Sequence, residues 1–305
     1  MGHDHHHHHH AAPSLTAANT AFKVGIALNM TFVLVEAGVG FYISSLSLLS
    51  DAAHNLADVG TLALSLLAFR LLKVKATDQY TYGYKKTSIL VSLFNSVILF
   101  VSIGGIVFES IHKAFIPNPE PLPGTTIAIV AGIGIVINGM SALLFFREKD
   151  KDINIKSAYL HLLTDALVSA GIVVGGIVIY YTQWYWIDTA LSLVIAGIIL
   201  VSTWQLLKES LRLSLDGVPE NIHLEDIRSI GIKMNGVADL HHIHVWAISS
   251  TENAMTAHLV LKKETTPEEE KHIKHDLRHE LEHKNIHHIT LETEREDEKC
   301  EAKVC

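Results

Sequence analysis

Six long apolar stretches constrain this chain of 305 residues more than any other feature of its sequence. Each stretch approaches the roughly 20 residues that a helix needs to cross a lipid bilayer. Only 18% of the residues are charged, whereas a typical soluble domain has about 25%. The sequence therefore predicts an all-α membrane domain of six helices, over residues 22–42, 47–71, 87–112, 125–146, 156–181 and 186–209.

The charges of the connecting loops predict how this domain is oriented. Lysine and arginine gather in the loop after the second stretch and in the loop after the fourth, whereas the loops on the opposite side contain Lys113 and no other basic residue. Because basic loops stay in the cytoplasm, both termini are expected to be cytoplasmic. We expect a multi-pass protein of a bacterial inner membrane.

A soluble domain is predicted after the last apolar stretch, where acidic residues become frequent. Its pattern reads as a helix (219–234), two strands (238–249 and 254–263), a helix (266–284) and a strand (287–294), which is a small αββαβ arrangement of the α+β class. The predicted domains are a His-rich disordered N-terminus, the membrane domain, the cytoplasmic domain and a Cys-containing tail, over residues 1–20, 21–213, 214–296 and 297–305.

Two repeated patterns lie inside the apolar stretches: His54-x-x-x-Asp58 in the second and His161-x-x-x-Asp165 in the fifth. Residues four apart share one face of a helix, so each pattern places an imidazole beside a carboxylate. Ionisable residues within a membrane span face the bundle interior and are functional candidates. Interhelical hydrogen bonding would explain one such residue, but the repetition in two spans favours a shared site.

The two pairs together would offer two nitrogen and two oxygen ligands, which is a tetrahedral zinc site. Calcium and magnesium prefer shells made of oxygen alone, so paired histidines argue against them. Cobalt, cadmium and nickel remain open alternatives, because a site of this type binds several such ions. Zinc and protons would compete for the same atoms. The predicted substrate is therefore Zn²⁺, exchanged for protons.

Several further stretches, together with these patterns, resemble the cation diffusion facilitator family, specifically its zinc-exporting branch. The similarity extends over residues 20–294 and is carried by Leu48–Asp58, Tyr82–Tyr84, Ala158–Asp165, Trp186–Asp188, Leu215–Pro219 and His241–Trp246. The resemblance implies six membrane helices, a ferredoxin-like cytoplasmic domain, a homodimer in the lipid bilayer and metal-for-proton exchange. It also implies His54, Asp58, His161 and Asp165 as transport ligands.

For the cytoplasmic domain, the resemblance implies zinc ligands at His241, His258, His287 and Glu294, with a structural or regulatory role. Strand alternation does not by itself unite this set. The two cysteines, Cys300 and Cys305, either complete such a site or belong to a loose, reduced tail. Four more histidines, spaced three or four apart along the helix predicted over 266–284, are read as a solvated face: His272, His275, His279 and His283.

The sequence departs from the family pattern in and after the loop that follows the second apolar stretch. Ser88 stands where the family often has an acid, whereas Lys86 matches its basic position. The stretch Lys73–Asp78 contains no histidine, so we predict no additional metal site in that loop. His5–His10 is either a purification tag or a natural ion-gathering segment, and the sequence does not decide between them.

Three functions compete for this chain. The first is a secondary transporter that exports zinc, which is not an enzyme. The second is an integral-membrane zinc hydrolase, which would need an open coordination position and a general base. The third is a membrane-anchored zinc sensor, for which the buried pairs would be dispensable. A nucleic-acid partner is excluded, because the formal net charge is −8. Zinc export is favoured.

Overall fold

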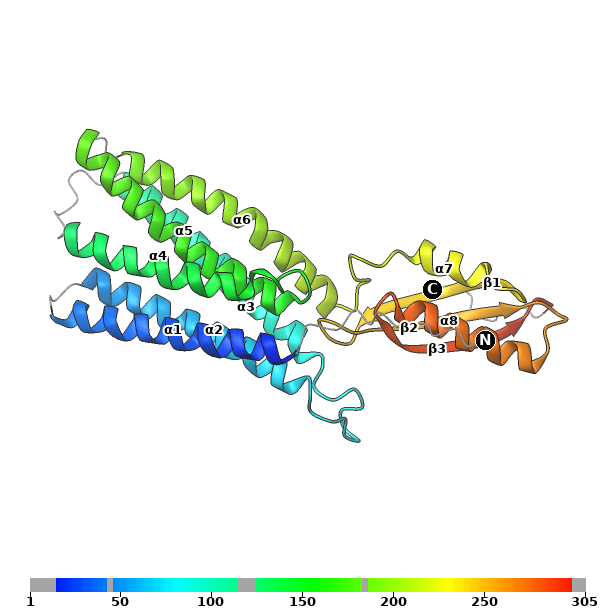
Figure 1. The fold of residues 1–305 in the computed structure, drawn as a ribbon. Helices are drawn as coiled ribbons and strands as arrows, with labels where there is room; N and C mark the ends of the chain where they lie inside the picture. Colours follow the sequence, from blue (N-terminus) through cyan, green and yellow to red (C-terminus); the bar gives the residue numbers. More distant parts are fainter. Residues whose placement is uncertain (1–14, 43–45, 115–123, 183–185, 298–305) are drawn as a thin grey trace, which may run out of the picture. The chain divides into compact units, whose positions relative to one another are not determined.

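The computed structural model describes residues 15–42, 46–114, 124–182 and 186–297 (Figure 1). Its contacts group into two compact units. The first comprises Met1–Lys73 and Val91–Leu207, and the second comprises Val74–Leu90 and Lys208–Cys305. The loop after the second predicted span therefore belongs with the C-terminal unit.

Each of the six predicted apolar stretches is helical within the described residues. The helices α1 and α6 are longer than predicted, because the polar and aliphatic residues that flank their apolar parts are also compatible with a helix. Their bounds are α1 (Leu15–Tyr42), α2 (Leu46–Leu71), α3 (Thr87–Ala114), α4 (Gly124–Phe146), α5 (Ile153–Thr182) and α6 (Trp186–Ser214).

The first unit is built around four of these helices, with α1 packed on α2 and α4, and α5 packed on α2 and α4. One buried cluster joins all four, and its centre is aromatic. The ring of Phe22 lies 5.4 Å from that of Phe69 and 4.8 Å from that of Phe145. A second cluster joins α3 to α6 through Leu99, Ile103 and Ala196.

Two segments of the described residues are long and apolar enough by composition to cross a membrane, namely Asn19–Val39 and Thr87–Gly105. A shorter apolar segment, Ala131–Phe146, lies in α4. The paired His and Asp residues lie in two other helices, α2 and α5. Six membrane crossings remain a prediction.

The second unit has the predicted order of helix, strand, strand, helix and strand (Figure 1). The strand β1 pairs with β2 antiparallel, and β2 pairs with β3 parallel. The first helix is shorter than predicted, because residues 219–222 form a turn before it. The bounds are α7 (Leu224–Ile232), β1 (Val237–Ala247), β2 (Asn253–Leu261), α8 (Pro267–Glu282) and β3 (Ile286–Arg295).

One face of this sheet is covered by α7 and α8, whose apolar residues complete a single core. The fully buried residues Leu240, Leu259 and Leu277 come from three different elements of that core. The start of α8 is fixed by a capping box, in which the Thr266 hydroxyl accepts from the Glu269 amide while the Glu269 carboxylate accepts from the Thr266 amide. Reciprocal capping of this kind satisfies two amides that the helix leaves free.

Candidate functional site: buried carboxylates and imidazoles

Three of the four residues predicted for the membrane site lie together. His161 Nε2 lies 2.8 Å from Asp58 Oδ1 and 3.9 Å from Asp165 Oδ2. One ligand atom of each residue lies within 4.8 Å of those of the other two. All three side chains are at most 12% exposed. The structure describes the backbone of His54, in α2, but not its side chain.

Helix geometry explains how this group forms. His161 and Asp165 are four residues apart on α5, so one turn of the helix brings them to the same face. Asp58 comes from α2, which packs directly on α5. Two carboxylates and one imidazole suit a divalent zinc-like cation, and a tetrahedral shell would need one further ligand. His54 lies one turn before Asp58 and is the expected donor.

A buried carboxylate that sequence analysis did not place in a site lies in α1. The side chain of Glu36 is 0% exposed, and its Oε2 accepts a hydrogen bond of 2.9 Å from Asn55 Nδ2. Asn55 is three residues before Asp58 on α2, so it occupies a neighbouring position on that helix. Glu36 is visible in the sequence as a polar interruption, but nothing in its spacing links it to α2.

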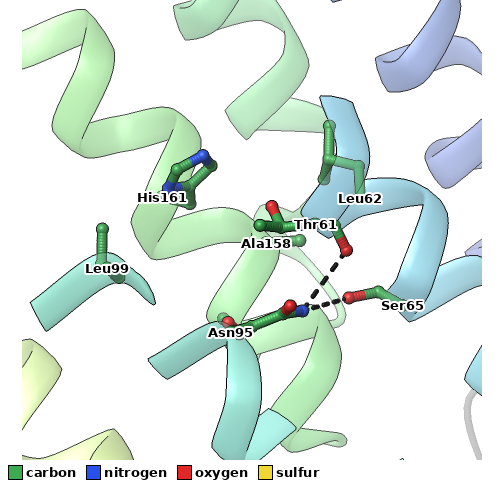
Figure 2. A pocket seen from close by; sticks show the side chains of 8 residues that line it. Thr61, Leu62, Ser65, Asn95, Leu99, Ala158 and His161 are labelled. Carbon is green, nitrogen blue, oxygen red and sulfur yellow. Dashed lines mark hydrogen bonds between the residues drawn. The ribbon is translucent and has the colours of Figure 1, made fainter. Parts of the chain in front are cut away.

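A narrow polar hollow adjoins His161 (Figure 2). Its polar lining comes from three helices: Thr61 and Ser65 on α2, Asn95 on α3, and Ser157 on α5. The side chains of Leu62, Leu99 and Ala158 complete the lining. The free space between these groups is too narrow for a water molecule.

A second group of metal-binding side chains lies on the sheet of the C-terminal unit. The ligand atoms of His241, His258 and Glu294 lie within 4.8 Å of one another. His241 Nε2 lies 3.6 Å from Glu294 Oε2, and His258 Nδ1 contacts Glu294 Oε1. The strand register produces this group. His258 on the central strand pairs with His241 on β1 and with Glu292 on β3, and Glu294 lies two residues beyond Glu292 on the same face of β3.

Two residues beside this group were not predicted as ligands. Glu292 Oε2 lies 3.4 Å from His258 Nε2. The His242 ring lies 5.0 Å from the rings of both His241 and His258. The strand register shifts between His241 and His244, and His242 has a φ of 48°. A bulge of this kind re-aims a side chain, but a regular alternating pattern does not predict where it occurs.

His287 lies away from the other predicted cytoplasmic ligands. Its neighbour His288 pairs with Ala254, whereas the group above surrounds His258, four residues farther along β2. That displacement corresponds to about 13 Å along a strand. Cys300 and Cys305 lie outside the described residues. The α8 histidines His272, His275, His279 and His283 are exposed, as expected of a solvated face.

The electrostatics beside the cytoplasmic group are set by Asp239 and Arg228. Burial raises the pKa of Asp239, but hydrogen bonds from the Arg228 side chain and the Leu240 amide outweigh it, so the pKa is lowered. Asp239 Oδ2 lies 3.6 Å from His241 Nδ1. A carboxylate at this position can orient the imidazole whose other nitrogen faces Glu294.

The segment 74–90 is attached to the C-terminal unit by basic and hydroxyl side chains. Lys86 pairs with Asp216 and donates to the carbonyl oxygens of Leu213 and Ala247, each at 3.2 Å. Lys85 pairs with Glu252. Ser88 stands where the family often has an acid, and its hydroxyl accepts from the Ser250 amide at 3.0 Å. The uncharged Ser88 hydroxyl therefore accepts a hydrogen bond at a position where the family often has a carboxylate.

Comparisons with known proteins match nearly the whole chain. A family model described as "Cation efflux transmembrane domain" matches residues 22–213, and one described as "Cation efflux protein, cytoplasmic domain" matches residues 219–296. A cadmium, cobalt and zinc/H(+)-K(+) antiporter of Bacillus subtilis (strain 168) is 33% identical over 298 residues, which cover 97% of this chain and 93% of the relative.

Two further relatives have names that refer to metal cation efflux and to zinc transport. The metal cation efflux system protein CzcD of Cupriavidus metallidurans is 33% identical, with 96% of this chain and 90% of the relative covered. The zinc transporter ZitB of Escherichia coli (strain K12) is 31% identical, with 96% and 93% covered.

Proposed function

This chain belongs to the cation diffusion facilitator family and is an integral membrane protein of metal cation efflux, and from that premise we propose that it is a zinc/proton antiporter. It takes Zn²⁺ from the cytoplasm and releases it on the other side of the membrane. The single observation that carries the proposal is the buried group of Asp58, His161 and Asp165.

The exchange of zinc for protons follows from the chemistry of these side chains. Zinc binds the unprotonated imidazole and the ionised carboxylates, so metal binding expels protons and protonation expels metal. An inward-facing site loads zinc, and an outward-facing site is discharged by protons. No cysteine is among the ligands, and the absence of a tight thiolate bond favours release. Cobalt and cadmium are secondary substrates, because a site of nitrogen and oxygen ligands binds several such divalent ions.

Orientation follows from the loops. Basic residues gather in two loops. One follows α2 and begins near Arg70 and Lys73, and the other follows α4 and contains Arg147 and Lys149. We therefore place both termini and the C-terminal unit in the cytoplasm. The cytoplasmic group of His241, His258 and Glu294 fits zinc, because two nitrogens and a carboxylate oxygen lie within reach of one ion. In this proposal that ion is structural or regulatory, and the protein acts as a homodimer.

The decisive experiment measures zinc-driven proton movement in proteoliposomes. We expect the wild type to exchange zinc for protons, and Asp58→Asn to lose this exchange, because the variant removes one anionic ligand. The matched control is Asp152→Asn. Asp152 is also buried, and its Oδ1 accepts from the Asn154 and Ile155 amides at 2.7 and 3.2 Å, which an asparagine can still do.

Two outcomes would contradict the proposal. Full zinc and proton flux in Asp58→Asn and in Asp165→Asn would remove these residues from the transport site. Zinc flux that leaves proton concentration unchanged on both sides would remove antiport while keeping metal export.

A further inference from the structure

The polar hollow beside His161 lies on the side of the site that faces the basic loops. On α2, Thr61 and Ser65 follow Asp58 toward Arg70, and on α5, Ser157 precedes His161 on the side of the loop containing Lys149. Asp58 and Ser65 are about 10 Å apart along the helix axis. Under the proposed function, this hollow occupies the cytoplasmic approach to the transport site.

Asn95 on α3 closes this approach by bonding to α2. Its Nδ2 donates to Ser65 Oγ at 2.8 Å and to the Thr61 carbonyl oxygen at 3.3 Å (Figure 2). The Thr61 hydroxyl in turn donates to the Asp58 carbonyl oxygen at 2.8 Å. One chain of contacts therefore runs from Asn95 to the helical turn that holds a predicted ligand.

The other polar atom of Asn95 has no hydrogen bond. The side chain is 5% exposed, and Oδ1 is buried without a hydrogen-bond partner among the described residues. Water cannot take that role in this conformation, because the hollow is too narrow to hold a molecule. Buried acceptors are normally satisfied, so one that is not needs a reason. The reason would be that Asn95 Oδ1 accepts a hydrogen bond in a second conformation of the protein.

We propose that Asn95 is a positioning residue of the zinc entry path. In the conformation seen here, its amide closes the path through Ser65 and Thr61. When α2 and α3 separate, its Oδ1 accepts a hydrogen bond from the water shell of the incoming divalent cation, next to His161. This inference rests on the proposed function and adds to it the residue that conducts the ion to its ligands.

The test uses inside-out membrane vesicles, in which the cytoplasmic face is exposed to added zinc. Initial rates of zinc uptake give KM and Vmax for Asn95→Leu and Asn95→Asp, and zinc binding at equilibrium is measured on the purified chains in detergent. Leucine has the same number of side-chain heavy atoms, with the same branching, and no polar atom. Aspartate keeps acceptor oxygens but cannot donate to Ser65 or Thr61. The variant Asn138→Leu is the control, since Asn138 is buried in α4 and does not line the hollow.

We expect Asn95→Leu to raise KM about tenfold, which corresponds to the loss of one hydrogen bond to a charged ligand. Zinc bound at equilibrium stays the same, because the ligands are intact. Asn95→Asp keeps a KM within about twofold of the wild type, since the acceptor remains. Asn138→Leu leaves KM unchanged.

The inference is overturned if Asn95→Leu has the wild-type KM, or if Asn95→Asp raises KM as much as Asn95→Leu does. The second result would mean that only the amide donors matter, as in a purely structural tie. If Asn95→Leu does not fold, Asn95→Val removes the same oxygen. A wild-type chain without zinc uptake would instead refute the proposed function, so the two failures are distinguishable.

Discussion

His258 is the residue on which the cytoplasmic group depends, because it lies on the central strand between its partners on β1 and β3. Sequence similarity implied His241, His258, His287 and Glu294 as a set, and the strand register explains why His241, His258 and Glu294 meet. The same register separates His287 from them. Alternation along one strand could not have shown this, since it says nothing about how three strands align.

The first residue-scale prediction concerns zinc binding by this group. We expect His258→Ala to lower the number of zinc ions bound per chain, because its two nitrogens face Glu294 and Glu292. His287→Ala is the matched control and leaves the number unchanged. Metal content after dialysis, measured by atomic emission, gives the answer. Equal losses in both variants would contradict the ligand set.

The second residue-scale prediction concerns acid stability. Hydrogen bonding from Lys274, at 2.7 Å, lowers the pKa of Glu270 below its ordinary value of 4.5, and Arg295 adds to this. The resulting stabilisation is fully present above the ordinary pKa and is lost as pH falls through the lowered one. We expect Glu270→Gln to lower the free energy of unfolding by about 1 kcal/mol near neutral pH.

That difference between Glu270→Gln and the wild type should narrow as pH falls below 4.5. It can be followed by hydrogen exchange of the α8 amides in the whole protein at several pH values. Glu280→Gln, an exposed position on the same helix, is expected to change stability by less than about 0.5 kcal/mol. A Glu270→Gln effect that grows in acid would refute this assignment.

At the scale of elements, α8 illustrates a boundary that local sequence determines. Thr266, Pro267 and the acids that follow predicted its start, and the observed helix begins at Pro267 with both bonds of the capping box. We expect Thr266→Ala to cost about 1 kcal/mol of stability. Thr266→Ser keeps the hydroxyl and serves as the control. Hydrogen exchange of the first α8 turn distinguishes them, and equal protection in both variants would count against the cap.

Other elements were predictable only in part. Apolar runs predicted the helices α1 to α6 from length and composition, and their membrane crossings stay a prediction. Their pairing depends on packing that a single sequence does not display, as in the contact of Phe22 with Phe145. The bulge at His242 depends on how β1 pairs with β2, and the attachment of Lys86 to the C-terminal unit is a tertiary contact. The Lys86 contacts explain why residues 74–90 group with a domain far away in sequence.

At the scale of the whole molecule, the prediction concerns the number of chains in the assembled protein. The proposed homodimer predicts a mass of twice 33.6 kDa for the protein component of the purified complex in detergent. Light scattering coupled to size exclusion measures this mass independently of the bound detergent. A value of one chain at the concentrations used for transport would contradict the homodimer and leave the membrane site untouched.

The parallel pairing of β2 with β3 has a consequence for how this chain is made. Because α8 lies between β2 and β3 in the sequence, Glu294 reaches His258 only after both α8 and β3 have been synthesised. A nascent or truncated chain that lacks β3 has no complete set of donors on this sheet. An ion captured there ties the first strand to the last and stabilises the finished domain by mass action, by about 1.4 kcal/mol for each tenfold excess over Kd. If the cytoplasmic group binds zinc as proposed, the stability of the finished domain depends on the metal that the protein is proposed to export.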